Sequence, residues 1–371
     1  MTHLRMDHPS SNTLNLTIMA LRVKLYNRFS VFSYFLLLCI LAACSQQEDT
    51  PVNSDLVSLK IMASASTKAV DGSGIEDLPK VEKAIYDLSV CIFDSKGNAI
   101  SFAGEQFNDG VSDEVKVYSR TAKGCTVYVV ANALKLGGSI SPFAGTTTLQ
   151  AFKNKVHTLT GQAQQANPEC LLMVGKKDNV DIDQNTGKIL VTLTRLASKL
   201  TFDVTLEDGI INGKTYPITV ESYQVCKVPD RAFYHQENFA IPAMPSGVQL
   251  QDLPISAGSA DKKQTYTCYV YANSNATGDN VTYLKIIAHS IASAADTDRK
   301  LWTDEFKVEL PNGKMVLPNY RYKVNILIKG WQNATNGIIT SYKAYPYFSS
   351  LQNLKQWEKE ENPDLMKGYV Y

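Results

Sequence analysis

Apolar and polar residues alternate along most of the chain with a period of two. Residues 56–65 show this most clearly, because Val57, Leu59, Ile61 and Ala63 alternate with more polar neighbours. This period gives a strand one apolar face, so the segment is predicted to be a half-buried β-strand. Similar segments occur at residues 85–93, 115–118, 125–131, 189–193, 218–225, 264–272, 281–289, 306–310 and 320–329. Many short strands separated by turn residues predict an all-β protein built from sandwiches.

A weak internal repeat predicts two tandem sandwich domains. Residues 128–132, YVVAN, recur as residues 269–273, YVYAN, and each copy ends a predicted strand at an asparagine suited to a turn. A Gly-Lys pair also precedes a strand in each half, at Gly187 and at Gly313. The matches occur in the same order, so we expect two related domains that join near residues 194–199.

Several stretches depart from the strand pattern. Residues 147–159, and also residues 163–168, are predicted to be a helix or an irregular insertion. Residues 351–361 are charged and also have a helical pattern. The glycines and small residues of 66–74 predict an exposed, protease-accessible loop that sets the first strand apart from the rest.

An apolar run at residues 29–43 ends at Cys44 and is followed at once by polar residues. Basic residues precede it, so the order is that of a secretory signal peptide, and Met19 would give such a peptide an ordinary start. The run is shorter than the about 20 apolar residues of a membrane-spanning helix and contains two serines. Two alternatives stay open, a transmembrane helix and an ordinary cleaved signal in which Cys44 has no role.

The sequence Leu-Ala-Ala-Cys at residues 41–44 resembles the bacterial lipobox. The resemblance implies cleavage between Ala43 and Cys44 and lipidation of the Cys44 thiol, with two or three acyl chains giving stable anchoring. The polar residues that follow indicate a tether. The predicted divisions are a leader and lipoprotein signal peptide at 1–43, a lipidated tether at 44–53, an N-terminal domain at 54–194, and a C-terminal domain at 195–371 with an extension at 331–371.

Composition and charge argue against several classes of function. The 371 residues carry a net charge of +1 without a basic or acidic block, which gives no support to nucleic-acid binding. Proteins or glycans are therefore the expected partners. Five of the seven cysteines follow the signal segment and none forms a Cys-x-x-Cys motif. They are interpreted as small buried residues, with a disulfide left open because an exported chain meets oxidising conditions.

No enzyme motif is present in the sequence. Metalloprotease, serine-hydrolase and phosphate-loop patterns are missing, and His157, His235 and His289 are far apart along the chain. Residues 181–187 alternate oxygen side chains as a calcium loop does, but the glycine comes one residue late and Thr192 stands where a closing glutamate is needed. A hairpin turn explains the same residues. We therefore predict no catalytic, cofactor-binding or metal-binding residues.

Tyrosines cluster in neighbouring predicted strands, at Tyr266, Tyr269, Tyr271 and Tyr283. Aromatic side chains of this kind bind sugars or serve as hot spots in protein interfaces. They also pack across strands in ordinary sheets. Both interpretations stay open at this point.

Taken in order, these features resemble the fimbrillins of Bacteroidales, the FimA-type major, tip and anchor subunits of type V pili. The resemblance rests on the lipobox, the separable first strand, YDLSVCIFD at 86–94 with Gly97, the VVAN strand end, LTRLASKL at 193–200 and LPNYRYKV at 317–324. It implies two transthyretin-like β-sandwiches, export as an outer-membrane lipoprotein, and assembly with other fimbrial subunits in a cell-surface fimbrium, with an adhesive role.

The resemblance also implies assembly by donor-strand exchange. In this family an arginine-specific surface protease cuts after the first strand, and a C-terminal segment of a neighbouring subunit fills the groove left behind. In this sequence the cut corresponds to the bond between Lys68 and Ala69, where lysine replaces arginine. Either another protease acts, or the subunit stays uncut as an anchor does. The donor would come from after Trp331, from residues 338–345 or from the terminal residues 368–371.

A second class of function uses the same residues. A permanently anchored surface lipoprotein could bind a glycan or a host protein through its aromatic side chains. The two classes differ in one respect, since only a fimbrial subunit needs its first strand to leave.

Overall fold

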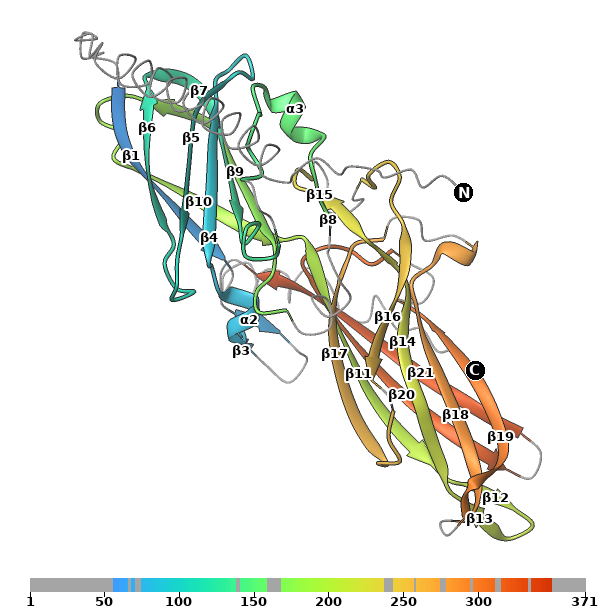
Figure 1. Ribbon diagram of the computed structural model, residues 1–371. Coiled ribbons are helices and arrows are strands. Elements are labelled where there is room, and N and C mark those ends of the chain that lie inside the picture. Colours follow the sequence, from blue (N-terminus) through green and yellow to red (C-terminus); the bar gives the residue numbers. More distant parts are fainter. Residues whose placement is uncertain are drawn as a thin grey trace, which may run out of the picture. The chain divides into compact units, whose positions relative to one another are not determined.

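The computed structural model describes residues 56–65, 68–70, 75–137, 141–158, 168–236, 243–256, 258–273, 278–293, 296–310, 315–332 and 335–348. The chain divides into two compact units, residues 1–55 and 56–371. The predicted signal peptide, Ala43, Cys44 and the tether lie outside the described residues. Strands dominate the second unit, which confirms the all-β prediction (Figure 1). Its division into two transthyretin-like domains stays a prediction.

The N-terminal half of the unit forms a seven-stranded sheet in the order β5-β4-β7-β9-β10-β1-β6. Its outer strands β5 and β6 meet again, because the Ser101 hydroxyl donates to the Tyr118 carbonyl at 2.5 Å, so the sheet folds back on itself. The strands are β1 (Leu56–Ala65), β4 (Asp87–Phe93), β5 (Ala99–Gln106), β6 (Glu114–Arg120), β7 (Ala122–Ala131), β9 (Met173–Ile182) and β10 (Lys188–Arg195).

The C-terminal half contains two larger sheets. One runs β17-β11-β20-β21-β2-β3, with β12 and β13 continuing beside β20, and the other runs β16-β14-β18-β19. The strands of the first are β2 (Lys68–Val70), β3 (Ile75–Asp77), β11 (Ala197–Glu207), β12 (Gly209–Ile211), β13 (Lys214–Tyr216), β17 (Lys263–Tyr271), β20 (Tyr320–Gln332) and β21 (Thr335–Phe348). Those of the second are β14 (Ile218–Pro229), β16 (Leu250–Ser256), β18 (Tyr283–Ser293) and β19 (Asp296–Glu309).

Helices are short in the described residues. They are α2 (Lys80–Lys83), α3 (Leu149–Lys153) and the 3-10 turn η1 (Gly278–Asn280). Of the two alternatives for 147–159, a helix is found only at Leu149–Lys153. The Thr148 side chain caps α3 and Phe152 is buried, but the chain then extends as β8 (Val156–Thr158) to pair with β15 (Arg231–Phe233). Pairing with a strand 75 positions away overrides the local helical pattern.

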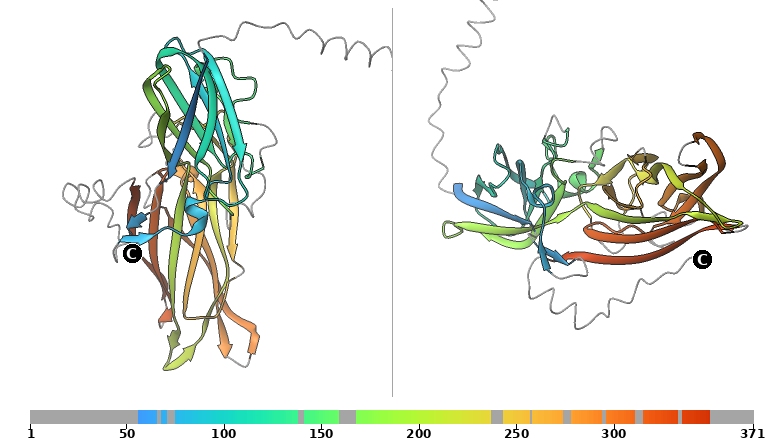
Figure 2. Two further views of the ribbon diagram at one scale, coloured as in Figure 1. Left: turned by 90° about the vertical axis from the view of Figure 1, so that its left-hand side faces the viewer. Right: turned by 90° about the horizontal axis from the view of Figure 1, so that it is seen from below.

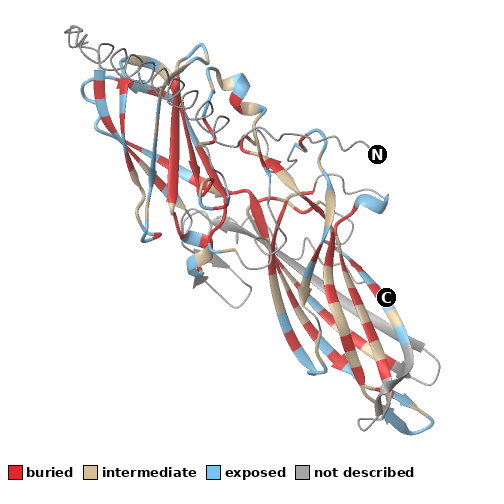
Figure 3. Ribbon diagram, viewed as in Figure 1, coloured by how far each residue is buried: buried red, intermediate tan, exposed pale blue. Residues whose placement is uncertain are grey.

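Buried side chains gather in three clusters. The N-terminal core lies inside the folded seven-stranded sheet, the C-terminal core lies between the two C-terminal sheets, and the junction core combines residues from both halves with α3. Figure 3 shows the alternation of buried and exposed positions along the strands. Strand β4 is buried at all seven positions, because it packs on the N-terminal core through one face and on the junction core through the other.

Strands β5, β9 and β16 were not predicted because they lack a regular apolar face, whereas β11 was not predicted although its buried positions alternate. Strand β9 has four consecutive exposed residues, Lys176 to Asn179, so its sequence lacks the alternation that marks a strand. Strands β5 and β16 are also mostly exposed or half-buried and were not predicted. Long-range pairing therefore defines these strands more than their own side chains do.

The close approach of β9 and β10 gives a test of the sheet. A Cβ atom at Gly175 would lie 2.3 Å from the Thr192 carbonyl oxygen and 2.8 Å from a Val191 methyl. We expect Gly175→Ala to lower the free energy of unfolding by about 3 kcal/mol, because the backbone cannot yield without disturbing the pairing.

Gly187 provides the matched control in the turn before β10, where no atom lies within 4 Å of an added Cβ. Gly187→Ala should change stability by less than about 0.5 kcal/mol. Urea unfolding of both variants measures the difference, and equal stabilities would contradict the close approach.

Candidate strand-exchange site

Strand β1 lies in the interior of the N-terminal sheet. It pairs in parallel with β10 on one side and antiparallel with β6 on the other (Figure 1). The predicted face is confirmed, since Val57, Leu59, Ile61 and Ala63 are exposed by 3% or less. The first strand of the unit is therefore held by two neighbours and by the N-terminal core.

Loss of β1 would open an apolar groove. The residues beside it on the same face are also buried, with Val115 and Val117 on β6 and Ile189 and Val191 on β10 all at 3% exposure or less. Burying a Val, Leu or Ile side chain contributes roughly 1.5–3 kcal/mol, so the three larger side chains of β1 contribute roughly 5–9 kcal/mol. An empty groove would also leave two strand edges without hydrogen-bond partners.

The opposite face of β1 is polar and contributes little. Lys60 forms an ion pair with Glu114 at 2.7 Å, with side-chain exposures of 58% and 38%. Exposed pairs of this kind are worth at most about 1 kcal/mol. Whatever occupies this position is therefore recognised mainly through its buried face and its backbone.

The candidate maturation bond between Lys68 and Ala69 lies in a strand. The prediction of a loop at 66–74 is wrong for Lys68–Val70, which form β2 and pair with β21 and β3. Residues 66, 67 and 71–74 lie outside the described residues. Edge backbone groups of β21 give β2 hydrogen-bond partners that its own sequence does not reveal.

The candidate donor segment at 338–345 is part of β21. This strand pairs antiparallel with β20 from Tyr320↔Pro346 to Gln332↔Thr335, so the segment belongs to the chain's own C-terminal sheet. It is extended, as predicted. The other candidate, residues 368–371, and the predicted helix at 351–361 lie outside the described residues.

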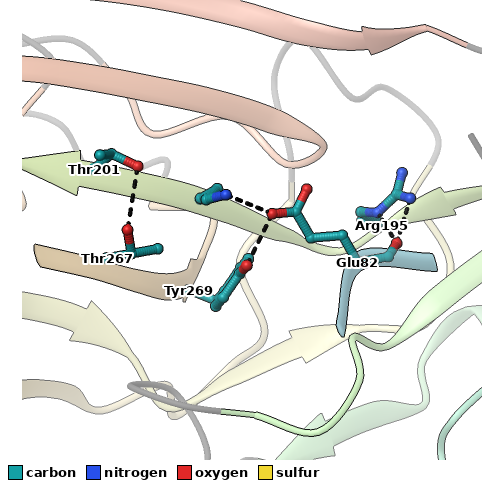
Figure 4. Close-up of polar contacts among 6 residues, drawn as sticks. Glu82, Arg195, Thr201, Thr267 and Tyr269 are labelled. Atoms are coloured by element: carbon teal, nitrogen blue, oxygen red, sulfur yellow. Dashed lines mark hydrogen bonds and ion pairs between the residues drawn. The ribbon is translucent and has the colours of Figure 1, made fainter. Parts of the chain in front are cut away.

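A buried polar cluster joins the two halves just after β3 (Figure 4). Glu82 of α2 is fully buried and forms an ion pair with Lys199 of β11 at 2.7 Å. The Tyr269 hydroxyl on β17 donates to the same carboxylate oxygen at 2.9 Å. The Arg195 Nε atom donates to the Glu82 carbonyl at 2.7 Å, and Arg195 is itself fully buried. We call these four residues the Glu82 cluster.

The charges and hydrogen bonds of the Glu82 cluster favour the ionised form of the Glu82 side chain. Burial by itself raises the pKa of Glu82, but the hydrogen bond and charge of Lys199, the charge of Arg321 and the Tyr269 hydroxyl outweigh it. The pKa of Glu82 therefore lies below its ordinary value. The ionised Glu82 side chain therefore pairs with Lys199 and holds α2 against strands of the C-terminal half.

Two of the sequence motifs meet beside this cluster. The Asn319 side chain accepts from the Arg195 amide at 3.2 Å, and the Asn319 amide donates to the Ala197 carbonyl at 3.1 Å. The Ser198 hydroxyl donates to the Leu317 carbonyl. Residues 193–200 and 317–324 thus form one structural element, whereas Glu82 was not found from the sequence because no motif marks it.

The repeated asparagines have matching roles. Asn132 ends β7, is fully buried, and its side chain donates to the carbonyls of Ala84 and Leu171 at 2.8 Å each. Asn273 follows β17, is 1% exposed, and donates to the carbonyls of Lys227 and Asn280. Each asparagine therefore ties adjoining segments to the end of its strand.

Two of the histidines are buried against tyrosines. The Nδ1 atom of His157 lies 2.9 Å from the Tyr271 hydroxyl, and that of His235 lies 2.7 Å from the Tyr128 hydroxyl. His289 instead pairs with Glu221 at 2.9 Å. Burial lowers the pKa of His157 from 6.5 to about 4, so it is neutral in the folded protein near pH 7.

This pKa predicts loss of stability in acid. Between pH 6.5 and about 4 the unfolded chain binds a proton at His157 that the folded chain does not. Stability therefore falls as the pH is lowered, and we expect His157 to account for about 2 kcal/mol between pH 7 and pH 4.5. Urea unfolding of wild type and His157→Asn at both pH values tests this. If wild type and variant differ in free energy of unfolding by the same amount at pH 7 and at pH 4.5, the prediction is wrong.

The other predicted residues have structural surroundings. Cys91, Cys125, Cys170, Cys226 and Cys268 are buried and unpaired with one another, so the disulfide alternative finds no support among them. Burial raises the pKa of Cys91 and of Cys170 to about 12. Tyr269 and Tyr271 are buried, and the Tyr266 ring packs on Tyr223 with centroids 4.4 Å apart, which favours sheet packing over a sugar platform.

Residues 183–187 connect β9 to β10, and these two strands pair antiparallel at their ends away from this connection, Val174 with Thr194 and Met173 with Arg195. The Asp183 carboxylate accepts from the Asn185 amide at 2.8 Å, and the Asp181 carboxylate accepts from the Gly124 amide at 2.8 Å. Within the described ranges, no group of three or more His, Cys, Asp or Glu residues is arranged to hold a metal ion.

No helix in the described part of the chain is long and apolar enough to span a membrane. The apolar run at 29–43 is outside that part.

Comparison with known proteins agrees with this architecture. Residues 56–221 match the family model described as major fimbrial subunit protein (FimA). A fimbrilin (FimA) from Porphyromonas gingivalis has a TM-score of 0.51 at 16% identity, covering 79% of this chain and 97% of that one. A candidate cell adhesion protein from Parabacteroides distasonis has a TM-score of 0.56 at 15% identity, and the match covers 79% of this chain and 98% of that one. A candidate cell adhesion protein from Bacteroides eggerthii has a TM-score of 0.56 at 15% identity, and the match covers 79% of this chain and 96% of that one.

The matching family model describes a class of fimbrial structural subunits, and the solved structures share the fold of this chain. Within that class, the resemblance to the Bacteroidales fimbrillins is confirmed, and residues 56–221 carry the FimA family match. No similar sequence is found among curated proteins.

Proposed function

We propose that this fimbrial subunit is exported as a lipoprotein through Cys44 and assembled by donor-strand exchange. The position of β1 is the observation that supports the proposal. It is the first strand of the compact unit, it lies between β6 and β10, and its buried face completes the N-terminal core. The same strand contributes four buried side chains to this core and, within the unit 56–371, is joined to the other strands at its C-terminal end only.

The exchange follows from this geometry. When the chain is cut after β1, the strand is held only by backbone pairing and by its apolar face. A strand from a neighbouring subunit that presents apolar side chains at alternate positions restores both interactions. Each subunit then donates to the next, and because such a head-to-tail contact does not close on itself, a filament grows.

Cutting the chain at a chosen place tests the proposal. A recognition sequence for a sequence-specific protease replaces residues 71–74, so that cleavage separates β1 and β2 from the rest. We expect the cleaved protein to lose the β1 fragment and form assemblies of increasing size, measured by size-exclusion chromatography and electron microscopy. An excess of a peptide of residues 56–65 should inhibit the assembly, whereas the same peptide with Ile61→Asp should not.

Two outcomes would contradict this proposal. A cleaved protein that keeps β1 and stays monomeric has no exchangeable strand. An acylated Cys44 at the amino terminus of all the protein on cells, with no terminus at Ala69, indicates a permanently anchored subunit or the alternative tethered binder. A terminus at Ala69 indicates processing at Lys68.

A further inference from the structure

The bond between Lys68 and Ala69 lies in the middle strand of three. On one side of β2, Lys68 and Ala69 pair with Phe348 and Tyr347 of β21. On the other side, they pair with Asp77 and Glu76 of β3. Figure 2 shows the short blue strands β2 and β3 beside the end of the red strand β21. Both backbone edges of the candidate maturation bond are therefore occupied.

Occupied edges matter for proteolysis. An extended peptide is recognised through pairing of its backbone with that of the binding protein, which requires at least one free edge. Here β21 covers one edge and β3 covers the other. Cleavage thus requires β2 to separate from at least one neighbour first.

The neighbour on one side is the candidate donor strand. Strand β21 pairs with β20 along Thr335 to Pro346, and β2 adds its pairing at the last two residues, Tyr347 and Phe348. The same short strand therefore covers the cut and holds the end of β21. The segment after β3 is fixed independently, because Glu82 of α2 is anchored by Lys199.

We propose that β2 is a latch between the maturation segment and β21. While β2 is paired, Lys68–Ala69 is protected and the end of β21 is held. Separation of β2 from β21 exposes the bond. Cleavage in turn loosens β21, because it divides β2 between Lys68 and Ala69, the two residues that pair with the end of β21. This inference rests on the proposed function, because it makes the release of β21 as a donor strand and the removal of β1 depend on the same event, the opening of β2.

A cross-link between the two strands tests the latch in the full chain. Ala69 and Tyr347 are Cα partners in an antiparallel pair, so cysteines there fall in the range of about 4.4–6.8 Å that a disulfide spans. The cysteines of the described residues are buried and free, and peptide mass mapping identifies the new bond. The readout is the rate at which a lysine-specific protease produces the new terminus at residue 69.

The oxidised Ala69→Cys/Tyr347→Cys variant is compared with the same variant after reduction. We expect the oxidised form to be cut at Lys68 at least about tenfold more slowly, because the cross-link blocks the local opening that cleavage needs. Reduction should restore the rate. A matched cross-link between Asn325 and Ser341, Cα partners that join β20 to β21 away from β2, leaves β2 free to separate from β21 and should not change the cleavage rate.

Hydrogen exchange tests the reciprocal effect. After cleavage at Lys68 in the wild-type chain, amides of β21 should exchange faster than in the uncut chain. Equal cleavage rates in oxidised and reduced protein, failure of the Ala69–Tyr347 disulfide to form, an equal slowing by the Asn325–Ser341 cross-link, or unchanged exchange in β21 would each overturn the latch.

The latch and the proposed function fail in different ways. If the Ala69–Tyr347 cross-link protects Lys68 but the cut protein never releases β1 or assembles, the latch holds and donor-strand exchange is wrong. If the chain cut at 71–74 assembles while the Ala69–Tyr347 cross-link gives no protection, exchange holds and the latch is wrong.

Discussion

Ile61→Asp is expected to lower the free energy of unfolding by at least about 4 kcal/mol, because it places a carboxylate in the N-terminal core without a partner. Ile61 is fully buried and lies on the face of β1 that completes this core. The loss combines the missing apolar contacts of isoleucine with the cost of removing a charge from water. A domain of ordinary stability, about 5–15 kcal/mol, would lose a large part of that stability through this single change.

Ser58→Asp is the matched control. Ser58 is an exposed residue of the same strand, three positions from Ile61 and on the opposite face. The same new charge should there change stability by less than about 0.5 kcal/mol. Urea unfolding monitored by circular dichroism measures both variants. Similar losses of stability in the two variants would mean that it does not matter which face of β1 carries the charge. That result would contradict the claim that the buried face of β1 fills an apolar groove.

Glu82→Ala is the second change with a large expected effect. It leaves the Lys199 ammonium, whose side chain is 13% exposed, without its carboxylate, and removes the acceptor of the Tyr269 hydroxyl. Breaking a buried pair by removing one partner costs about 3–5 kcal/mol, because the remaining charge is buried alone. Replacing both charges by apolar residues, Glu82→Leu with Lys199→Met, should recover a large part of this loss.

The exposed pair Lys60–Glu114 serves as the control for the Glu82 cluster. Glu114→Ala removes an ion pair of the same length, 2.7 Å, in which both side chains are well exposed. Its loss should cost less than about 1 kcal/mol. Thermal and urea unfolding compare the variants, and a Glu82→Ala loss as small as that of Glu114→Ala would mean that the cluster does not join the two halves.

The Glu82 cluster also has a predicted pH dependence. The pKa of Glu82 in the folded protein lies below the ordinary value near 4.5. The carboxylate therefore contributes stability above pH 4.5, and this contribution is lost as the pH falls through the folded pKa. Stability of Glu82→Ala should accordingly fall less in acid than that of wild type, which adds to the separate effect of His157.

The periodicity of the sequence predicted β1 and its buried face correctly. The reason is local, because successive side chains of a strand point to opposite sides and a buried face requires an apolar residue at every second position. Strands β7, β10, β14 and β20 were found in the same way. Strand β9 was missed because its Lys176–Asn179 segment is exposed on both faces, so no alternation marks it.

The sequence by itself determined that the chain is all-β, which residues of its first strand face a core, and which family its motifs resemble. The tertiary structure decided which strands are neighbours. It placed β1 between β6 and β10, paired β2 with β21, and brought Glu82 to Lys199, 117 positions away. Side-chain alternation is a property of a strand alone, whereas neighbours depend on the register and folding of the whole chain.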